Sequence, residues 1–460
     1  MFEILVFAYM NHIYSSRAIE QACKTDVRFM WLLQGESAPD HATFARFQNE
    51  RLTDVIEDLF VQLVMKLHEL GEINIRNIFI DGTKIEANAS RYTFVWAKTV
   101  EKNLQKLNAK INQELPELCQ KYGLSETASL VDVVAFLLNA RDLLGIQFVY
   151  GKGKRKTEIQ RDYDHIYEYL ERIEKYHESQ IILGTLKSYS KTDLDATFMR
   201  MKEDHMRNGQ LKPAYNVQIG VESEYIVGIG LYSNPTDTTT LIPFLERLKN
   251  NIGRKYTNVI ADAGYASEEN YTYLEENEQN AYIKPVDYEI RKTKKYKKNI
   301  YRVENLSYDE IGDYFTCPNG KRLNHAYDGK RKTKNGYEVV KSYYICESCE
   351  GCPHREKCYK GKYENRKISF SKTMARQKAE ATERITADEG NILRQNRSIQ
   401  VEGSLGIVKQ NRDFRRFLTR GKTKTETQFF LLAFAFNINK LHNRTIYNRL
   451  GLELFNQEAA

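Results

Sequence analysis

The sequence predicts a mixed α/β protein in which a helical segment precedes a core that contains a sheet. Apolar residues recur at helical spacing over the first part of the chain, up to residue 71. Short apolar or alternating runs at residues 73–80, 215–231, 258–261 and 281–284 then have the character of strands, and the alternation within residues 215–221 predicts a half-buried strand. Between them lie helical patterns, with Ser267 as the expected N-cap of one helix. The order strand, hairpin, helix, strand, helix, strand is typical of a mixed α/β domain.

The N-terminal segment carries local signals for helix ends. Ser37-x-x-Asp40, with Pro39 between them, is a capping-box signature and predicts a helix start. The apolar residues of 44–63 recur at helical spacing, and Gly71 stands where a glycine would end that helix. Because Met1 lies inside an apolar pattern, we expect upstream sequence to be missing.

Changes of pattern along the chain predict five segments. A helical hairpin and a basic, cysteine-rich block each interrupt the core. The expected segments are 1–71 (helical, of DNA-binding type), 72–98 with 185–285 (first part of the core), 99–184 (helical hairpin insertion), 286–370 (basic cysteine-rich insertion) and 371–460 (helical part of the core).

The charge balance favours a phosphate-rich partner. The chain has 69 Lys and Arg against 61 Asp and Glu in 460 residues, a formal net charge of +8. Basic residues gather in Arg291–Lys298, Lys330–Lys334 and Arg412–Lys424, often beside Tyr or Phe. One such block is usually a solvated face, but three in one chain favour nucleic acid.

Nothing in the sequence predicts a membrane segment. No run reaches the roughly 20 apolar residues that span a bilayer, and the best run, Phe429–Phe436, predicts a core helix instead. The N-terminus has no basic region before its apolar residues, so it does not have the pattern of a signal peptide. We therefore expect a cytoplasmic, nucleoid-associated protein.

Three acidic residues lie at positions where burial of a carboxylate would cost free energy unless its charge were compensated. Asp81 is expected to end the strand of residues 78–80, and Asp262 the strand of residues 258–261, while Glu402 lies on a predicted helix. Asp237 is a competing candidate, ranked lower because it lies in a loop where a helix cap is expected. The alternative for each strand-end aspartate is a turn or capping role.

Carboxylates that cluster require a cation. Like charges repel, so one carboxylate would take up a proton unless a cation lay among them. Mg²⁺ or Mn²⁺ prefers such oxygen ligands, and two such ions can support phosphodiester cleavage and strand transfer. If Asp81, Asp262 and Glu402 converge, the sequence predicts a divalent-metal site.

Five of the seven cysteines fall in one short stretch. Cys346-x-x-Cys349-x-x-Cys352, followed by Cys358, has metal-ligand spacing, and Cys317 opens a separate knuckle-like turn. Four of these five would suffice for a structural Zn²⁺ in a zinc-ribbon-like insertion, and the alternative is five reduced, unligated thiols. The basic residues of 291–298, with Tyr296 and Tyr301, suit phosphate contacts and stacking.

Several motifs together resemble the DDE transposases of bacterial insertion sequences, and the resemblance covers nearly the whole chain. They are Ile80-Asp81-Gly82-Thr83-Lys84, Ala261-Asp262-Ala263-Gly264-Tyr265, Glu402 with Lys409 seven residues later, residues 88–96, Pro213–Gln218 and Tyr14-Ser15-Ser16-Arg17. Each motif is weak, but their ordered combination is specific.

The resemblance implies a ribonuclease-H-like core in which Asp81, Asp262 and Glu402 hold Mg²⁺ or Mn²⁺. In similar enzymes the lysine that matches Lys409 contacts DNA near the cut, so the resemblance implies this role here. Lys409 is expected two helical turns from Glu402 and on the same face. Many relatives carry Tyr seven and Arg four residues before this glutamate. Here those positions are Gln395 and Ser398, with arginines one residue earlier. The DNA contacts expected beside Lys409 are Arg394, Arg397, Arg415 and Arg416.

The expected function is DNA transposition. Such an enzyme cuts double-stranded DNA at the terminal inverted repeats of its element and joins the freed ends to target DNA, and the resemblance implies a synaptic homodimer. Two alternatives stay open: a zinc-stabilised, catalytically inactive DNA-binding relic, and a nuclease of the same fold that cuts without joining.

Overall fold

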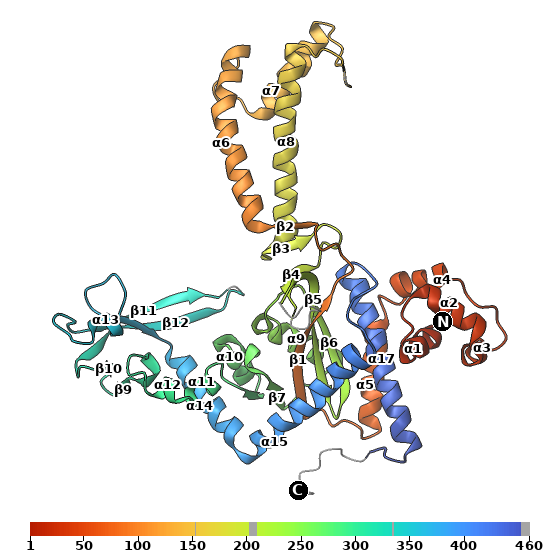
Figure 1. Ribbon diagram of the computed structural model, residues 1–460, viewed down its shortest axis with the longest axis vertical. Helices are drawn as coiled ribbons and strands as arrows, with labels where there is room; N and C mark the ends of the chain where they lie inside the picture. The colour runs from red at the N-terminus through yellow and green to blue at the C-terminus, as the bar shows by residue number, and fades with distance from the viewer. Residues whose placement is uncertain (152, 202–208, 334, 452–460) are drawn as a thin grey trace. The chain divides into compact units, whose positions relative to one another are not determined.

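The computed structural model describes residues 1–151, 153–201, 209–333 and 335–451 (Figure 1). The chain divides into two compact units. The first comprises Met1–Ile85, Asn216–Thr419 and Thr423–Ala460, and the second comprises Glu86–Tyr215 and Arg420–Lys422. In the described part of the chain, no helix combines the length and apolar character that crossing a bilayer requires.

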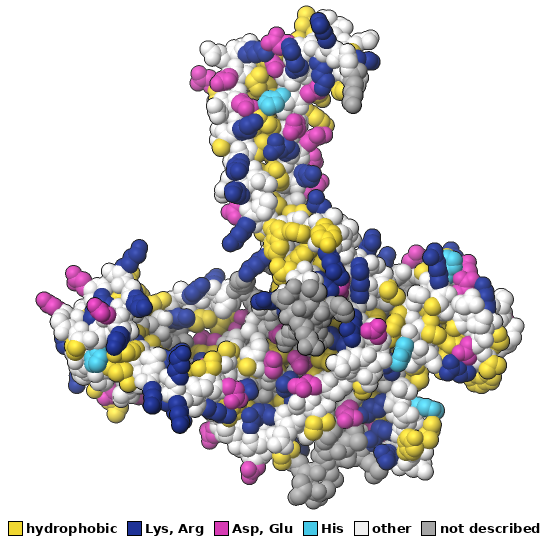
Figure 2. Space-filling view, in the orientation of Figure 1, with side chains coloured by type: hydrophobic (Ala, Val, Ile, Leu, Met, Phe, Trp, Pro, Cys, Tyr) yellow, Lys and Arg dark blue, Asp and Glu magenta, His cyan; other side chains and the backbone are white. Residues whose placement is uncertain are grey.

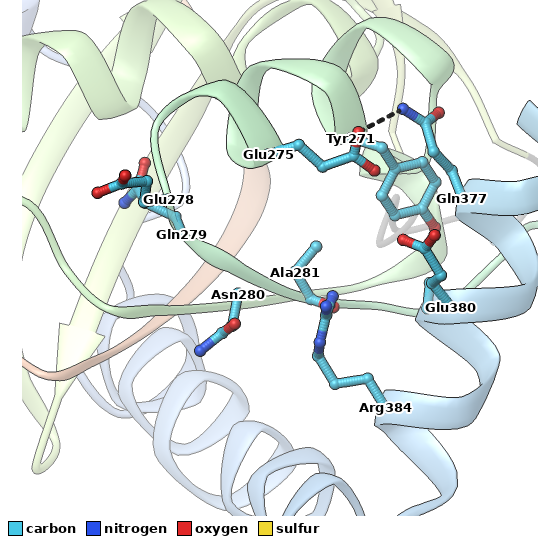
Figure 3. Close-up of a pocket in the computed structure, with 10 residues that line it drawn as sticks. Tyr271, Glu275, Glu278, Gln279, Asn280, Ala281, Gln377, Glu380 and Arg384 are labelled. Atoms are coloured by element: carbon cyan, nitrogen blue, oxygen red, sulfur yellow. Dashed lines mark hydrogen bonds between the residues drawn. The ribbon is translucent and has the colours of Figure 1, made fainter. Parts of the chain in front are cut away.

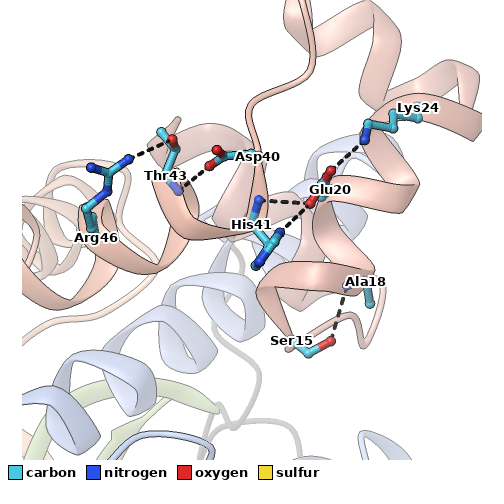
Figure 4. A network of polar contacts seen from close by, with 8 residues as sticks. All are labelled: Ser15, Ala18, Glu20, Lys24, Asp40, His41, Thr43 and Arg46. Carbon is cyan, nitrogen blue, oxygen red and sulfur yellow. Dashed lines mark hydrogen bonds and ion pairs between the residues drawn. The ribbon is translucent and has the colours of Figure 1, made fainter.

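The first unit begins with a group of short helices whose starts are set by polar caps. Asp40 caps the fourth helix, since its carboxylate accepts from the Thr43 N–H at 2.6 Å (Figure 4). The predicted start at Ser37 is therefore wrong by one turn. Glu20 of the second helix also accepts from both the backbone and the ring of His41. The helices are α1 (Phe2–Met10), α2 (Ser16–Thr25), α3 (Val27–Leu33), α4 (His41–Arg46) and α5 (Ile56–Glu69).

The helix predicted across residues 44–63 is interrupted. A π-helical turn, η1 (Phe47–Arg51), follows α4, and α5 begins only at Ile56. Phe44, Leu52, Ile56 and Phe60 are buried on either side of this break, so spacing alone did not reveal it. Gly71 lies just beyond the C-cap Leu70 with φ of +71°, which confirms its predicted role at the helix end.

The core sheet has strand order β4-β5-β1-β7-β8, with β6 also paired to β5. β1 and β7 are parallel, and so are β7 and β8. β1 was expected to start near Ile73 and to end at Asp81. It starts instead at Asn77, because Ile75 has a left-handed φ of +59°. The strands are β1 (Asn77–Glu86), β4 (Thr197–Arg200), β5 (Leu211–Glu222), β6 (Tyr225–Tyr232), β7 (Asn258–Ala261) and β8 (Asn280–Ile283).

β5 and β6 form the predicted hairpin, but β5 is not half-buried. The turn residues Ser223 and Glu224 both have left-handed φ values, +50° and +61°, as a tight hairpin turn requires. Along β5 the apolar face is buried as expected. The polar face is buried too, since Asn216 is 1% exposed and Gln218 is fully buried. These two polar side chains therefore face an interior site rather than solvent.

Helices pack on the sheet and cover its edge. The long helix α17 (Lys422–Ile446) buries Phe429–Phe436, which confirms the predicted core helix. Its Asn437 exchanges side-chain hydrogen bonds with both backbone groups of Ile226, and its Glu426 accepts from the Leu231 N–H at 3.1 Å. The free backbone edge of β6 is thereby capped by side chains. α9 (Leu241–Ile252) and α10 (Glu268–Glu276) lie between the strands in sequence, and Ser267 caps α10 as predicted.

The cysteine-rich block forms its own sheet, ordered β13-β12-β11-β10-β9. Its apolar core is small and is centred on Phe315, Leu323 and Tyr344. The strands are β9 (Ser307–Asp309), β10 (Tyr314–Thr316), β11 (Arg322–Lys332), β12 (Glu338–Cys346) and β13 (Lys367–Phe370), preceded by α11 (Tyr288–Lys292) and α12 (Lys294–Lys297), with α13 (Arg355–Cys358) before β13.

A segmented helical stretch follows this block and carries Glu402. It consists of α14 (Lys372–Thr386), α15 (Asp388–Arg397), the π-helical η5 (Ser398–Glu402), α16 (Gly403–Gly406) and the π-helical η6 (Ile407–Asn411). The helical segment predicted from residue 371 is therefore interrupted at Ala387 and loses regular α-helical geometry after Arg397.

The second unit consists mainly of three helices, α6 (Ala97–Tyr122), α7 (Leu130–Leu143) and α8 (Glu158–Leu183). They share an apolar core that includes Leu107, Leu137 and Ile166. Gly123, with φ of +65°, ends α6, and the segment predicted as a helical hairpin contains three helices. β2 (Phe94–Trp96) and β3 (Ser188–Ser190) pair antiparallel beside these helices.

Candidate active site

Asp81 and Asp262 follow paired positions on two neighbouring parallel strands. Ile80 of β1 is in register with Ala261 of β7, so the two aspartates are the next residues on adjacent strands. β7 ends there, and Asp262 turns back to accept from the Gly264 N–H at 2.7 Å. β1, in contrast, continues through Asp81 to Glu86, so the prediction that Asp81 ends its strand is wrong.

Arg397 connects Asp81 to Glu402. Its guanidinium lies 3.4 Å from the Oδ2 of Asp81 and 3.8 Å from the Oε1 of Glu402. The side chains of Arg397 and Asp81 are only 19% and 22% exposed, whereas that of Glu402 is 61% exposed. The structure therefore brings Asp81 and Glu402 to one cation and places Asp262 beside Asp81.

This arrangement has the donors of a divalent-metal site without the ligand geometry. Carboxylate oxygens are the ligands that Mg²⁺ and Mn²⁺ prefer, so the residue types fit such an ion. Among the described residues, however, no group of three or more His, Cys, Asp or Glu side chains is arranged to hold a metal ion. In this structure the guanidinium of Arg397 supplies the positive charge that neighbouring carboxylates need.

The π-helical turn η5 explains the one-residue shift of the arginine. In a π turn the backbone bonds run from residue i to i+5 rather than i+4. Arg397 stands five residues before Glu402, and η5 occupies Ser398–Glu402 between them. The extra residue is absorbed by the π turn, so Arg397 faces Glu402 where an α-helix would present Ser398.

The contacts found for Arg394 and Arg415, two other predicted DNA-contacting residues, are with residues other than the three acidic residues. Arg394 bonds Asn391 and lies 6.0 Å from the centre of the Tyr288 ring. Arg415 and Arg416 are exposed, and Arg415 pairs with Asp413 at 3.1 Å. Lys409 lies on η6, and because π turns take more residues than α turns, it is not two regular turns from Glu402.

Sequence reasoning missed a buried polar network beside the two aspartates. The Oδ1 of Asp237 accepts from the amide of Asn216 at 2.7 Å and from that of Gln218 at 3.0 Å. Gln218 also donates to the Oδ1 of Asn216 at 3.0 Å and accepts from the Tyr265 hydroxyl. Asp237 therefore uses its carboxylate here and does not cap α9. The alternating Asn-x-Gln of β5 was the available signal.

The pKa of Tyr265 is affected by burial and by the negative charges of the nearby aspartates. Tyr265 is fully buried, and burial raises the pKa of its phenol well above the usual range. The negative charges of Asp237, Asp81 and Asp262 raise this pKa further, while Arg397 lowers it. Three aspartates therefore act on one hydroxyl, which stays protonated and serves as a hydrogen-bond donor.

A cavity of about 270 Å³ lies elsewhere, between α10, β8 and α14 (Figure 3). Its lining is polar, with Glu275, Gln377, Glu380 and Arg384 around it, and Gln377 donates to Glu275 at 3.4 Å. None of the three predicted catalytic carboxylates lines it. The acidic cluster is thus not at this cavity.

The five clustered cysteines surround one small space of about 20 Å³, together with His354 and Arg366. Burial, followed by its neighbour Cys349, raises the pKa of the Cys346 thiol to about 12. The Arg366 guanidinium lies 3.0 Å from the Cys358 sulfur. The described thiols do not form a metal-ligand group in this structure. They are Cys317, Cys346, Cys349, Cys352 and Cys358.

Basic side chains gather over the α11–α12 segment, as Figure 2 shows. The lysines of α12 and Lys298 are exposed. Tyr296 is not available for stacking, because it is 5% exposed and Arg302 lies 4.5 Å from the centre of its ring. Tyr301 instead bonds His354 at 3.1 Å. The exposed lysines remain suited to phosphate, whereas the predicted stacking role of Tyr296 is wrong.

Two protein-family models match the chain. The model described as Transposase DDE domain matches residues 316–442, which include the five clustered cysteines and Glu402. The model described as Transposase domain (DUF772) matches residues 1–50, the N-terminal helices. No curated protein and no solved structure matches the chain. The two matches, one near each end of the chain, support the identification of an insertion-sequence DDE transposase.

Proposed function

We propose that this protein is an active transposase that cuts the ends of its own insertion sequence and joins them to target DNA. Asp81, Asp262 and Glu402 are the proposed catalytic carboxylates. The observation that supports this proposal is the proximity of the three residues. The two aspartates follow paired positions on adjacent parallel strands, and Arg397 lies within ion-pair distance of both Asp81 and Glu402. The matches to transposase families support the same reading.

The proposed cofactor is Mg²⁺ or Mn²⁺, held by Asp81, Asp262 and Glu402. When bound, it would neutralise charge on the phosphate that reacts and assist the attack of water or of a 3′-hydroxyl. The side chains themselves must first be released from Arg397. A guanidinium so released lies at the site with donors suited to a DNA phosphate oxygen. We assign Arg397 this phosphate contact.

The proposed DNA contacts outside the acidic cluster are Lys409, Arg394, Arg415 and Arg416. The exposure of Arg415 and Arg416 supports this role, since phosphate contacts need reachable cations. The strand order of the core sheet supports a ribonuclease-H-like fold. A homodimer on paired element ends remains part of the proposal, because two ends must be cut together.

A structural zinc in the cysteine sheet is a separate proposal. Four of the five thiols around the small space would hold it, and its support is the poor apolar core of that sheet. Zinc would then contribute folding energy rather than chemistry.

A strand-transfer assay separates this function from its two alternatives. The probe is a duplex that carries the DNA flanking the coding sequence, incubated with full-length protein, Mg²⁺ and a target plasmid. The transposase yields joined products, which Glu402→Gln abolishes. A nuclease yields cut ends that are never joined, and a relic binds the duplex but leaves it intact, so either result refutes the proposal.

A further inference from the structure

Asp237 lies between the two segments that carry the proposed catalytic aspartates. A Cβ built on Gly82, next to Asp81, would fall 2.7 Å from the Oδ1 of Asp237. A Cβ built on Gly264, two residues after Asp262, would fall 3.5 Å from the other carboxylate oxygen of Asp237. The Asp237 carboxylate therefore lies close to the backbone after Asp81, where glycine leaves the room that a side chain would fill. It is also within van der Waals distance of the Cβ position at Gly264, after Asp262.

The same carboxylate fixes the orientation of the amides beneath the site. Because its Oδ1 accepts from the Nε2 of Gln218 at 3.0 Å, the Gln218 oxygen must point away from it. That oxygen accepts from the hydroxyl of Tyr265. Tyr265 belongs to the 3-10 turn η3 (Ala263–Tyr265), which starts immediately after Asp262. Asp237 thus reaches the Asp262 segment by two routes, directly and through Gln218.

The Gln218 amide also packs against the segment that carries Asp81. The Nε2 of Gln218 lies 2.4 Å from the Cβ position at Gly82, so this amide packs directly on the backbone after Asp81. Gln218 is fully buried and bonded on both sides, which leaves it no freedom to swing away. Asp237 and the amide that it orients therefore pack against the residues that follow the paired strands β1 and β7.

We propose that Asp237 is a positioning residue that fixes where Asp81 and Asp262 stand relative to each other. This rests on the proposed function, in which those aspartates share one divalent cation. Asp237 acts through Gln218 and Tyr265 and does not itself contact DNA. Displacement of reacting groups by about 1 Å can cost on the order of 100-fold in rate, so a residue of this kind has a measurable effect.

The test uses Asp237→Asn, which keeps the shape of the side chain but removes its negative charge and replaces one of its two acceptor oxygens by an NH2 group that can only donate. Under single-turnover conditions at saturating flanking-DNA duplex, we expect its cleavage rate to fall by about 100-fold. The Kd for the duplex, measured by fluorescence anisotropy in Ca²⁺, should stay within two-fold of wild type. Glu276→Gln, an exposed acid of α10, is the matched loss of one charge and should change neither quantity.

A double-mutant cycle distinguishes positioning from a general loss of structure. Tyr265→Phe removes only the hydroxyl that bonds Gln218, and we expect a smaller loss in the same direction. If the two residues act through Gln218, the double variant is no slower than Asp237→Asn alone, whereas independent effects would multiply. Multiplying effects, or a wild-type cleavage rate in Asp237→Asn, overturn the inference.

A second readout is independent of DNA cleavage. Ligand binding to the folded state raises the melting temperature, so Mn²⁺ should stabilise the wild-type protein. We expect this shift to shrink by at least half in Asp237→Asn and to stay unchanged in Glu276→Gln. If wild type neither cuts nor joins DNA, the proposed function fails. The positioning role is then decided by the Mn²⁺ shift, and an unchanged shift in Asp237→Asn refutes it.

Discussion

Arg397 donates to Asp81 over 3.4 Å, although 316 residues separate the two along the chain. The same guanidinium lies 3.8 Å from Glu402, so it is the positive charge shared by two proposed catalytic carboxylates. A cation in this place and a divalent metal would compete for the same oxygens. Removing the guanidinium should therefore change how strongly the protein binds a divalent metal.

Replacing Arg397 by Gln should strengthen the binding of divalent metal while lowering metal-free stability. Without the guanidinium, Asp81 and Glu402 lose their compensating charge, and we expect the melting temperature in EDTA to fall by roughly 2 °C. The stabilisation on adding Mn²⁺, read by differential scanning fluorimetry, should be larger than in wild type. Arg394→Gln is the control on the same helix. A smaller Mn²⁺ shift in Arg397→Gln would mean that the guanidinium supports the site and does not compete for it.

Adding a methyl group at Gly82 should destabilise the fold at the acidic cluster. The new Cβ would lie 2.4 Å from the Nε2 of Gln218 and 2.7 Å from the Oδ1 of Asp237, both held in place by hydrogen bonds. Overpacking of this kind costs about 1–3 kcal/mol, so Gly82→Ala should lower the urea midpoint of unfolding. Gly403→Ala, where no atom lies within 4 Å of the new Cβ, should leave it unchanged or raise it. Equal midpoints for the two variants would refute the close packing.

Glu222 should make the protein less stable as the pH rises. Burial raises its pKa to about 7, although it accepts from the backbone N–H groups of Asn74, Ile75 and Arg76. The folded state therefore holds a proton that the unfolded state releases near pH 4.5, so the contribution to stability is complete below pH 4.5 and declines towards pH 7. We expect the melting temperature of the wild type to fall relative to that of Glu222→Gln as the pH rises from 5 to 8. A difference that does not vary with pH would contradict the raised pKa.

The cysteine sheet should carry zinc in the purified protein. If four of its thiols hold the ion, elemental analysis should find about one zinc per chain, and Cys349→Ser should lose it. Cys23→Ser, far from the cluster in sequence and buried in α2, is the control and should keep the metal. An absence of zinc from protein purified without chelator would contradict this prediction. The small apolar core would then be what stabilises the sheet.

The features that could be predicted from sequence were those set by local pattern. The strand of residues 258–261 was predicted at its observed bounds, and Ser267 caps α10 as expected. A run of buried residues or a capping side chain depends on a few neighbours, which the sequence shows directly. The same holds for the apolar helix at Phe429–Phe436.

The misses came from contacts made at a distance. The π turn at Ser398–Glu402 moves Arg397 into register with Glu402, and nothing local marks that extra residue. The polar face of β5 was expected in solvent, yet Asn216 and Gln218 are buried because Asp237 accepts from both. Polar residues become core residues only when the rest of the fold supplies their partners. Those partners lie some twenty residues further along the chain.

The most direct test of the shared acidic site is a crystal structure of the full-length protein soaked with Mn²⁺, with anomalous scattering used to locate the ion. We expect an anomalous peak within ligand distance of Asp81 and Asp262, with Arg397 withdrawn from Asp81. Anomalous peaks confined to other surfaces, with Arg397 still paired to Asp81 at saturating Mn²⁺, would contradict it.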